Sequence, residues 1–188
     1  MKTATIDIDG VLNNYPACWL DYISMHKKEV YATLAEAKMK LDPEEYKSIK
    51  HSYRTSGYKG TIPINSHAIA FTKSLKDMGY TIVIATSRPF HLYPGLKDLT
   101  YKWLKEGGIV FDHLEKKSPE LLEKYPQIKF HIDDELDHTH FLLNAAIDVF
   151  IIRNKDVDYG NHLQYKSLKF VDSLGDVLTL IERNEVNL

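Results

Sequence analysis

The sequence predicts an α/β fold, in which a doubly wound, mostly parallel sheet carries a small helical cap inserted after its first strand. Three observations lead to this prediction. Short β-branched or aromatic segments alternate with helix-like segments along most of the chain, an alternation typical of parallel sheets with right-handed crossovers. The strand-like segments lack polar alternation, as expected of strands covered on both faces. The interval between the first two strands is far longer than one crossover helix.

Six segments have the composition of strands. The first, residues 3–9, is a β-favouring run that ends in acid, apolar, acid and then glycine. The following runs are short and rich in Ile, Val, Phe and Thr, residues that favour strands. These later strands are predicted at residues 81–86, 109–112, 128–133 and 147–152, with a shorter β-like run at 168–171.

The helices between these strands are bounded by residues that suit helix ends. Glycine favours the position just after a helix, and proline favours its first turn. Glycines follow the first two predicted helices of the core, and Ser-Pro opens the third. The core helices are predicted at residues 67–78, 96–106, 118–125 and 173–182.

Residues 13–64 form the predicted cap, and residues 1–12 and 65–188 form the predicted core. The cap contains helix-like segments at 17–28, 32–40 and 43–51 and many aromatic residues. These rings either fill the interior of a small helical unit or stack on a ligand in the cleft. The candidate ligand contacts from the cap are Trp19, His51 and Tyr58.

Composition sets the class of protein. The 188 residues, 44% of them apolar, suffice for one domain with a modest insertion. A net charge of −2 and a pI near 6.5 argue against a broad nucleic-acid surface. Cys18 is the only cysteine, so an internal disulfide is impossible, which fits a reducing compartment. Without a signal-peptide core or a membrane-length apolar stretch, we expect a cytoplasmic protein with no membrane partner.

Pairs of carboxylates follow two of the predicted strands. Asp7 and Asp9 end the first strand, where residues two apart point to the same side. Asp133 and Asp134 end the fourth strand, and ligands of open α/β sheets bind beyond the carboxyl ends of strands. Converging acids indicate a Mg²⁺ site, or one carboxylate kept protonated to work as an acid. For Asp134, capping of the next helix is the alternative.

A hydroxyl pair and a lysine follow the other two strands. Thr86 and Ser87 end the second strand and suit the oxygens of a phosphoryl group, to which Arg88 could add a charged donor. A polar turn is the alternative for this segment. After the third strand, Lys116 or Lys117 could neutralise a phosphate and a carboxylate, whereas the alternative for both is a solvated surface.

The order acid-acid, hydroxyl, lysine, acid-acid resembles the haloacid dehalogenase-like (HAD) phosphohydrolase superfamily over nearly the whole chain. The first motif of that superfamily, DxD followed by Gly and Val or Thr, matches residues 7–11. Its second motif matches Thr86, its third a lysine placed at Lys117, and its fourth Asp133 and Asp134. The helical insertion is similar to the superfamily's cap of the first type.

Within the superfamily the chain is most similar to the 5'(3')-deoxyribonucleotidases. This resemblance implies a small phosphomonoester as substrate, with nucleotides among the candidates. The matching segments are residues 9–12, 57–58, 62–63, 85–87, 101–104 and 132–134.

The resemblance also implies a mechanism. Asp7 would attack phosphorus and form an aspartyl-phosphate. Asp9 would protonate the leaving alkoxide and then take a proton from water. Mg²⁺ would bind Asp7, the backbone carbonyl of Asp9 and Asp133, with Asp134 acting through water.

The remaining site residues would act on the phosphoryl group. Thr86 and Lys117 would stabilise the charge that develops during transfer, and Ser87 and Arg88 would bind substrate. An acid at position 9, which can shuttle protons, favours a phosphatase over a dehalogenase.

Two other functions are alternatives to this phosphatase. One is removal of phosphate from a nucleic-acid 3' end, which needs an open basic groove. The other is a catalytically silent module that binds a nucleotide or a partner through its cap. The sequence leaves the oligomeric state open.

Overall fold

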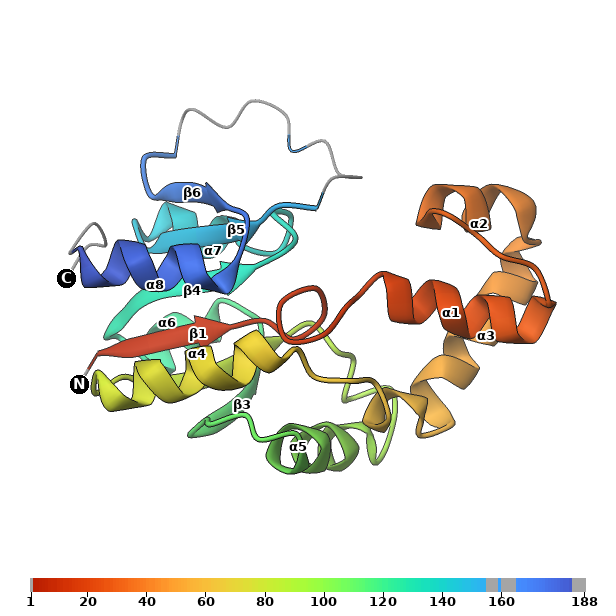
Figure 1. Cartoon of the computed structure of the whole chain (residues 1–188), viewed down its shortest axis with the longest axis horizontal. Coiled ribbons are helices and arrows are strands. Elements are labelled where there is room, and N and C mark those ends of the chain that lie inside the picture. The colour runs from red at the N-terminus through yellow and green to blue at the C-terminus, as the bar shows by residue number, and fades with distance from the viewer. Residues whose placement is uncertain (1, 155–158, 160–164, 184–188) are drawn as a thin grey trace.

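The protein, described here from a computed structural model that covers residues 2–154, 159 and 165–183, is built on a parallel sheet (Figure 1). Six strands lie in the order β3-β2-β1-β4-β5-β6, and every pairing is parallel. The predicted α/β class is therefore confirmed. The strands are β1 (Thr3–Ile6), β2 (Thr81–Thr86), β3 (His113–Lys116), β4 (Ile128–Asp133), β5 (Asp148–Ile152) and β6 (Leu168–Val171).

Helices cover both faces of the sheet, which is why the central strands are almost entirely buried. In Figure 1, α4 (Ser66–Asp77) and α8 (Leu174–Glu182) lie in front of the sheet. They share one buried cluster with residues of α5 (Leu96–Glu106). Residues of α6 (Glu120–Lys124) and α7 (His140–Asn144) belong to the cluster on the opposite face. The result is a three-layer domain.

The central strand β1 aligns the segments that carry the polar residues. Ile6 lies opposite Ile84 of β2 on one side and opposite Ile132 of β4 on the other. The ladder continues one step further, because the amide of Asp7 donates to the carbonyl of Ile132 at 2.9 Å. The chain segments that follow β1, β2 and β4 therefore leave the sheet at the same edge.

Two strand predictions were wrong in their bounds. β1 ends at Ile6 instead of residue 9, because the chain turns at Gly10, whose φ is +84°. β3 lies at His113–Lys116 instead of 109–112. The apolar side chains of Ile109 and Phe111 are buried in the core without belonging to a strand, whereas β3 is an edge strand whose polar residues resemble a loop in the sequence.

The helix predictions differ less from the structure. α3 continues to Thr55, beyond the predicted end at residue 51, and the short α7 was not predicted. None of the helices in the described parts of the chain is long and apolar enough to cross a membrane.

The cap lies to one side of the sheet (Figure 1). It has its own cluster of buried residues, which includes most of its aromatic rings. Asn13 and Ile64 form an antiparallel bridge where the two connections to the core run side by side. The cap elements are α1 (Ala17–Lys27), α2 (Leu34–Lys40), α3 (Pro43–Thr55) and the short 3₁₀ helix η1 (Tyr58–Gly60).

Substitution of Phe130 tests how tightly the core is packed. Its ring is fully buried on β4 and makes edge contacts with two other rings. The ring centre lies 5.4 Å from that of Tyr80 and 5.8 Å from that of Phe150. We expect Phe130→Ala to lower the free energy of unfolding by about 3–5 kcal/mol, measured by urea denaturation, because a cavity replaces a large ring. The exposed Leu92, substituted by Ala, should change it by less than about 0.5 kcal/mol. Equal losses for the two variants would contradict this account of the core.

Candidate active site

Three carboxylates meet beyond the ends of β1 and β4. Asp7, Asp133 and Asp134 each offer one oxygen, and these atoms lie within 4.8 Å of one another. Asp7 and Asp133 are buried, and Asp134 is half-buried. The register of the two neighbouring strands produces this arrangement, since Ile6 and Ile132 are paired and the acids follow them directly.

Lys117 is the cation of this cluster. Its Nζ lies 2.5 Å from Asp133 Oδ2 and 3.2 Å from Asp7 Oδ1. The backbone amide of Lys117 donates to the carbonyl of Thr86 at 2.9 Å, which fixes the residue beside β2. Burial lowers the pKa of Lys117, but the charges of Asp7 and Asp133 outweigh burial and raise it, so the amine stays charged. Lys116 is exposed on β3, so Lys117 is the lysine that reaches the carboxylates.

One lysine does not neutralise three acids. Burial raises the pKa of Asp7 to about 8; Lys117 lowers it, whereas Asp133 and Asp9 add to the rise. Burial, together with the charges of Asp7 and Asp133, raises the pKa of Asp134 to about 9. The cluster therefore holds more negative charge than its surroundings stabilise.

The donor set fits a hard divalent cation. None of the described residues donates a well-aligned hydrogen bond to the buried Oδ1 of Asp7. Apart from the Lys117 ion pair, this oxygen is free to bind a cation. Together with carboxylate oxygens of Asp133 and Asp134, it forms the type of ligand set that Mg²⁺ uses with water and phosphate.

Hydrogen bonds from neighbouring residues fix the Asp133 carboxylate. His131 Nε2 donates to Asp133 Oδ2 at 2.9 Å, and His131 Nδ1 lies 2.8 Å from the hydroxyl of Thr5. Burial lowers the pKa of His131, so the ring is neutral and Nδ1 accepts from Thr5. Burial raises the pKa of Asp133, but the His131 hydrogen bond and the Lys117 charge outweigh it and hold the pKa at about 2.

Gly10 lets Asp134 approach. A Cβ at Gly10 would lie 2.1 Å from Asp134 Oδ2 and 2.7 Å from Asp134 Cβ, far inside van der Waals contact. The φ of +84° also disfavours any side chain at this position. The glycine after the first acid pair thus has two physical roles, the turn itself and the space for a carboxylate.

Asp9 lies apart from the carboxylate cluster and forms ion pairs with two cations. Arg88 Nη2 lies 2.7 Å from Asp9 Oδ1, and Lys59 Nζ lies 3.1 Å from Asp9 Oδ2. Asn13 Nδ2 donates to Oδ1 at 2.9 Å. Burial raises the pKa of Asp9, but the Arg88 and Lys59 charges outweigh burial and hold the pKa well below its usual range. The side chain is thus ionised and is not one of the clustered oxygens.

Arg88, which the sequence predicts to bind substrate, lines the cavity and also contacts Asp9. Arg88 is buried, with two of its nitrogens on the Asp9 carboxylate and Nη1 on the Thr100 hydroxyl at 3.1 Å. Its guanidinium also lies over the ring of Trp103. These contacts orient the Asp9 carboxylate.

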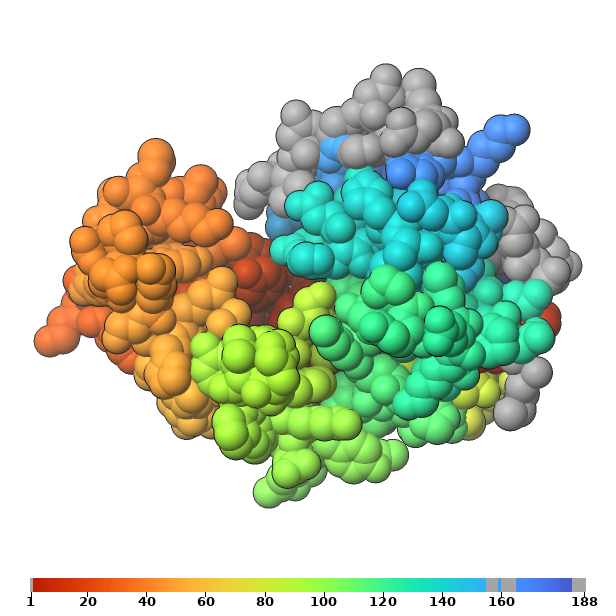
Figure 2. All heavy atoms as spheres, turned by 180° about the vertical axis from the view of Figure 1, so that it is seen from behind, coloured from red at the N-terminus to blue at the C-terminus, as the bar shows by residue number. Residues whose placement is uncertain are grey.

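A cavity of about 260 Å³ lies over these groups. Its walls come from both the core and the cap, and Figure 2 shows the molecular surface hollowed between the two. From the core it is lined by Asp7, Asp9, Thr86, Ser87, Arg88, Pro89, Lys117, Asp134, Glu135 and His138, and from the cap by Tyr15, Trp19, Lys50, Tyr53, Arg54 and Lys59.

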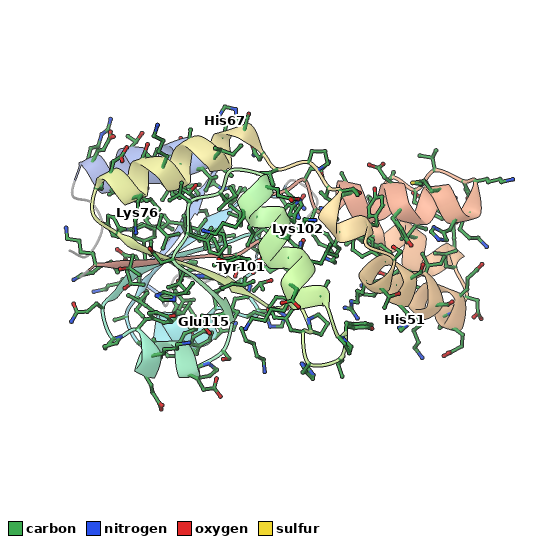
Figure 3. All side chains as sticks on the ribbon, turned by 90° about the horizontal axis from the view of Figure 1, so that it is seen from below. His51, His67, Lys76, Tyr101, Lys102 and Glu115 are labelled. Atoms are coloured by element: carbon green, nitrogen blue, oxygen red, sulfur yellow. The ribbon has the colours of Figure 1, made fainter. Side chains whose placement is uncertain are left out.

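Of the three contacts predicted from the cap, the structure brings only Trp19 to the cavity. Tyr58 does not line it, because its ring packs inside the cap, 4.6 Å from that of Tyr22. His51 is exposed on α3 (Figure 3), with its ring 5.5 Å from that of Tyr93. Position 51 is one residue beyond Lys50, which does face the cavity, so it points about 100° away around the helix.

Sequence reasoning missed the cations that the cap contributes. Lys59 is 6% exposed, and no sequence pattern distinguishes it from a surface lysine. Lys50 and Arg54 are spaced i, i+4 and so share a face of α3. The spacing alone does not say whether this face of the helix points to the cavity or to solvent.

No family model and no curated protein matches the sequence of this chain. Solved structures match its fold. A HAD family hydrolase from Deinococcus radiodurans with bound phosphate and sodium has a TM-score of 0.66 at 12% identity, covering 100% of this chain and 98% of that chain. A HAD hydrolase of family IA, variant 3, from Entamoeba histolytica has a TM-score of 0.59 at 17% identity, covering 94% of this chain and 95% of that chain.

A D,D-heptose bisphosphate phosphatase from B. bronchiseptica, complexed with magnesium and phosphate, has a TM-score of 0.56 at 12% identity, covering 98% of this chain and 99% of that chain. At such identities the likeness concerns the fold. The chain has the α/β architecture found in HAD-family hydrolases.

Gly10→Ala should be more damaging than the same change at Gly79. Both glycines have φ above +80°, but a Cβ at Gly79 meets nothing within 4 Å. We expect Gly79→Ala to lower the free energy of unfolding by about 1 kcal/mol, and Gly10→Ala to lower it by a further 1–3 kcal/mol or so, since Asp134 must move. Urea denaturation measures both. Equal losses would mean that Asp134 does not lie against Gly10.

Proposed function

We infer that this protein is a Mg²⁺-dependent phosphatase that hydrolyses a small phosphomonoester through an aspartyl-phosphate. The observation that supports this most is the convergence of Asp7, Asp133, Asp134 and Lys117 beside the buried hydroxyl of Thr86 at one cavity. A glycosidase would need only two carboxylates, which leaves the lysine and hydroxyl without a role.

The residues can divide the reaction into two displacements. A carboxylate oxygen of Asp7 forms a bond to phosphorus while the bond to the ester oxygen breaks, and the leaving alkoxide takes up a proton. Water then attacks phosphorus, which releases inorganic phosphate and the Asp7 carboxylate. The ionised Asp9 accepts the proton of this water. Arg88 and Lys59 favour that ionised form, so Asp9 can serve as the acid of the first step only after it has gained a proton.

The other groups stabilise charge. Lys117 lies on the nucleophile itself, and the Thr86 and Ser87 side chains line the same cavity. Preorganised donors of this kind account for most of the rate enhancement in phosphoryl transfer. Asp7, Asp133 and Asp134 would hold Mg²⁺, which when bound supplies positive charge to the phosphoryl oxygens.

The volume of the cavity limits the size of the substrate. A volume of about 260 Å³ is near the lower limit for ligand pockets, which favours a compact phosphomonoester. Specificity for a deoxyribonucleotide stays a prediction, as does the cytoplasmic location. Two of the similar structures contain phosphate, one of them with magnesium, which supports a phosphatase over the silent module.

Asp7→Asn should abolish phosphate release while leaving the fold intact. The amide cannot act as the nucleophile, so we expect kcat to fall by about 1,000-fold or more in an assay of inorganic phosphate with Mg²⁺ present. Asp77→Asn, on the exposed face of α4, is the matched control and should retain full activity. Wild-type turnover by the Asp7 variant would exclude the covalent mechanism.

Lys116 and Lys117 offer a test with adjacent residues. Lys117→Gln removes the cation next to Asp7 and should lower kcat by about 100- to 1,000-fold, whereas Lys116→Gln should change it by less than about twofold. The same phosphate assay measures both. Equal effects of the two substitutions would remove Lys117 from the mechanism.

The alternative functions differ in the substrate that they accept. Nucleoside monophosphates, sugar phosphates and an oligonucleotide with a 3'-phosphate can be compared in one panel. We expect the small compounds to be hydrolysed and the oligonucleotide to be a poor substrate. A reversed order would favour the nucleic-acid 3'-phosphatase, and no release from any compound would favour the silent module.

A further inference from the structure

The cations that line the cavity fall into two groups. Lys117, Arg88 and Lys59 form ion pairs with the catalytic carboxylates of the core. Lys50 and Arg54, both on α3 of the cap, make no ion pair within 4.0 Å with any carboxylate that the structure describes. Among the described residues, no carboxylate therefore pairs with these two cations.

The structure holds both side chains at the cavity. Arg54 Nη1 donates to the hydroxyl of Tyr93 at 3.2 Å, and its guanidinium lies 5.3 Å from the centre of that ring. Lys50 Nζ lies over the ring of Tyr46 at 5.9 Å. Both side chains are half-buried. Burial and the neighbouring charges of Arg54 and Lys38 lower the pKa of Lys50, and the charge of Glu135 acts in the opposite direction.

We propose that Lys50 and Arg54 bind a second anionic group of the substrate, a carboxylate or a second phosphate, at the end remote from the phosphate that is cleaved. This inference rests on the proposed function, because it places the reacting phosphate at Asp7. The cap wall supplies Lys50 and Arg54, whereas the core wall supplies Asp7 and Lys117, which follow β1 and β3. A compact substrate that carries an anion at each end spans these two walls.

The cavity also contains an acid that could compete for these cations. Glu135 lies on the core wall, and its charge favours the protonated form of Lys50, but it is not in ion-pair contact. A latch between Lys50 and Glu135 that closes the cap would therefore be the main competing role. Such a latch would affect every substrate equally, whereas an anion site affects only substrates that carry the second anion.

Two matched pairs of compounds separate these roles. Phosphoglycerate and glycerol phosphate differ only in a carboxylate that replaces a hydroxymethyl group. Fructose bisphosphate and fructose monophosphate differ only in the second phosphate. We expect the wild-type protein with Mg²⁺ to have a kcat/KM at least about tenfold higher for one doubly anionic compound than for its partner, mainly through KM. The pair within which the doubly anionic compound is preferred identifies the bound anion as a carboxylate or a phosphate.

The variants then test the residues. The double variant Lys50→Gln/Arg54→Gln should reduce that preference to less than about twofold, with the loss in KM. Lys47→Gln is the matched control, since this exposed lysine of α3 pairs with Glu44 and does not line the cavity; it should keep the preference. A wild-type protein without preference, a preference that survives the double substitution, or an equal loss on both members of a pair would each overturn the proposal.

A failure of the phosphatase itself gives a different result. If the wild-type protein releases phosphate from none of the four compounds, the proposed function fails, and calorimetric binding of the same compounds still tests the anion site. Tighter binding of a doubly anionic compound that the double variant loses would support the site. Equal binding within both pairs, or no binding at all, would overturn it.

Discussion

Negative charge concentrated at the buried ends of β1 and β4 is the constraint on which the rest of the site depends. Three carboxylates whose oxygens lie within 4.8 Å of one another repel at short range in a region that water does not screen. Lys117 offsets part of this charge, and His131 fixes the orientation of Asp133. The remaining negative charge fits a hard cation, which would offset the charge of the carboxylates and of a bound phosphate.

Asp9 is separated from this cluster although it is two residues from Asp7. Arg88, which follows β2, and Lys59, from the cap, hold its carboxylate between them. Because of this separation, the pKa values of two neighbouring acids shift in opposite directions. Burial raises the pKa of Asp7, and the two cations hold the pKa of Asp9 low. Because Lys59 belongs to the cap, the protonation of Asp9 is physically linked to the position of the cap over the core.

The cap and the core divide the work of recognition. In the proposed function, the core provides the groups that would act on the phosphoryl group, and these lie at the ends of the sheet strands. The cap provides an aromatic wall with Trp19 and Tyr53 and a pair of cations, Lys50 and Arg54. In the proposed function, chemistry and specificity therefore lie largely on different elements, and Lys59 is the cap residue that contacts a carboxylate of the core.

The sequence by itself determined the α/β class, the parallel sheet and the convergence of Asp7 with Asp133, because the pattern of strands and the acids that follow them are local properties. It did not determine the edge strand β3, since polar His113 and Glu115 resemble a loop until they are paired. Nor did it assign Arg88 to Asp9 or bring Lys59 into the site. These contacts join residues 79 and 50 positions apart, and only the packing of the cap on the sheet decides which distant cation neutralises which acid.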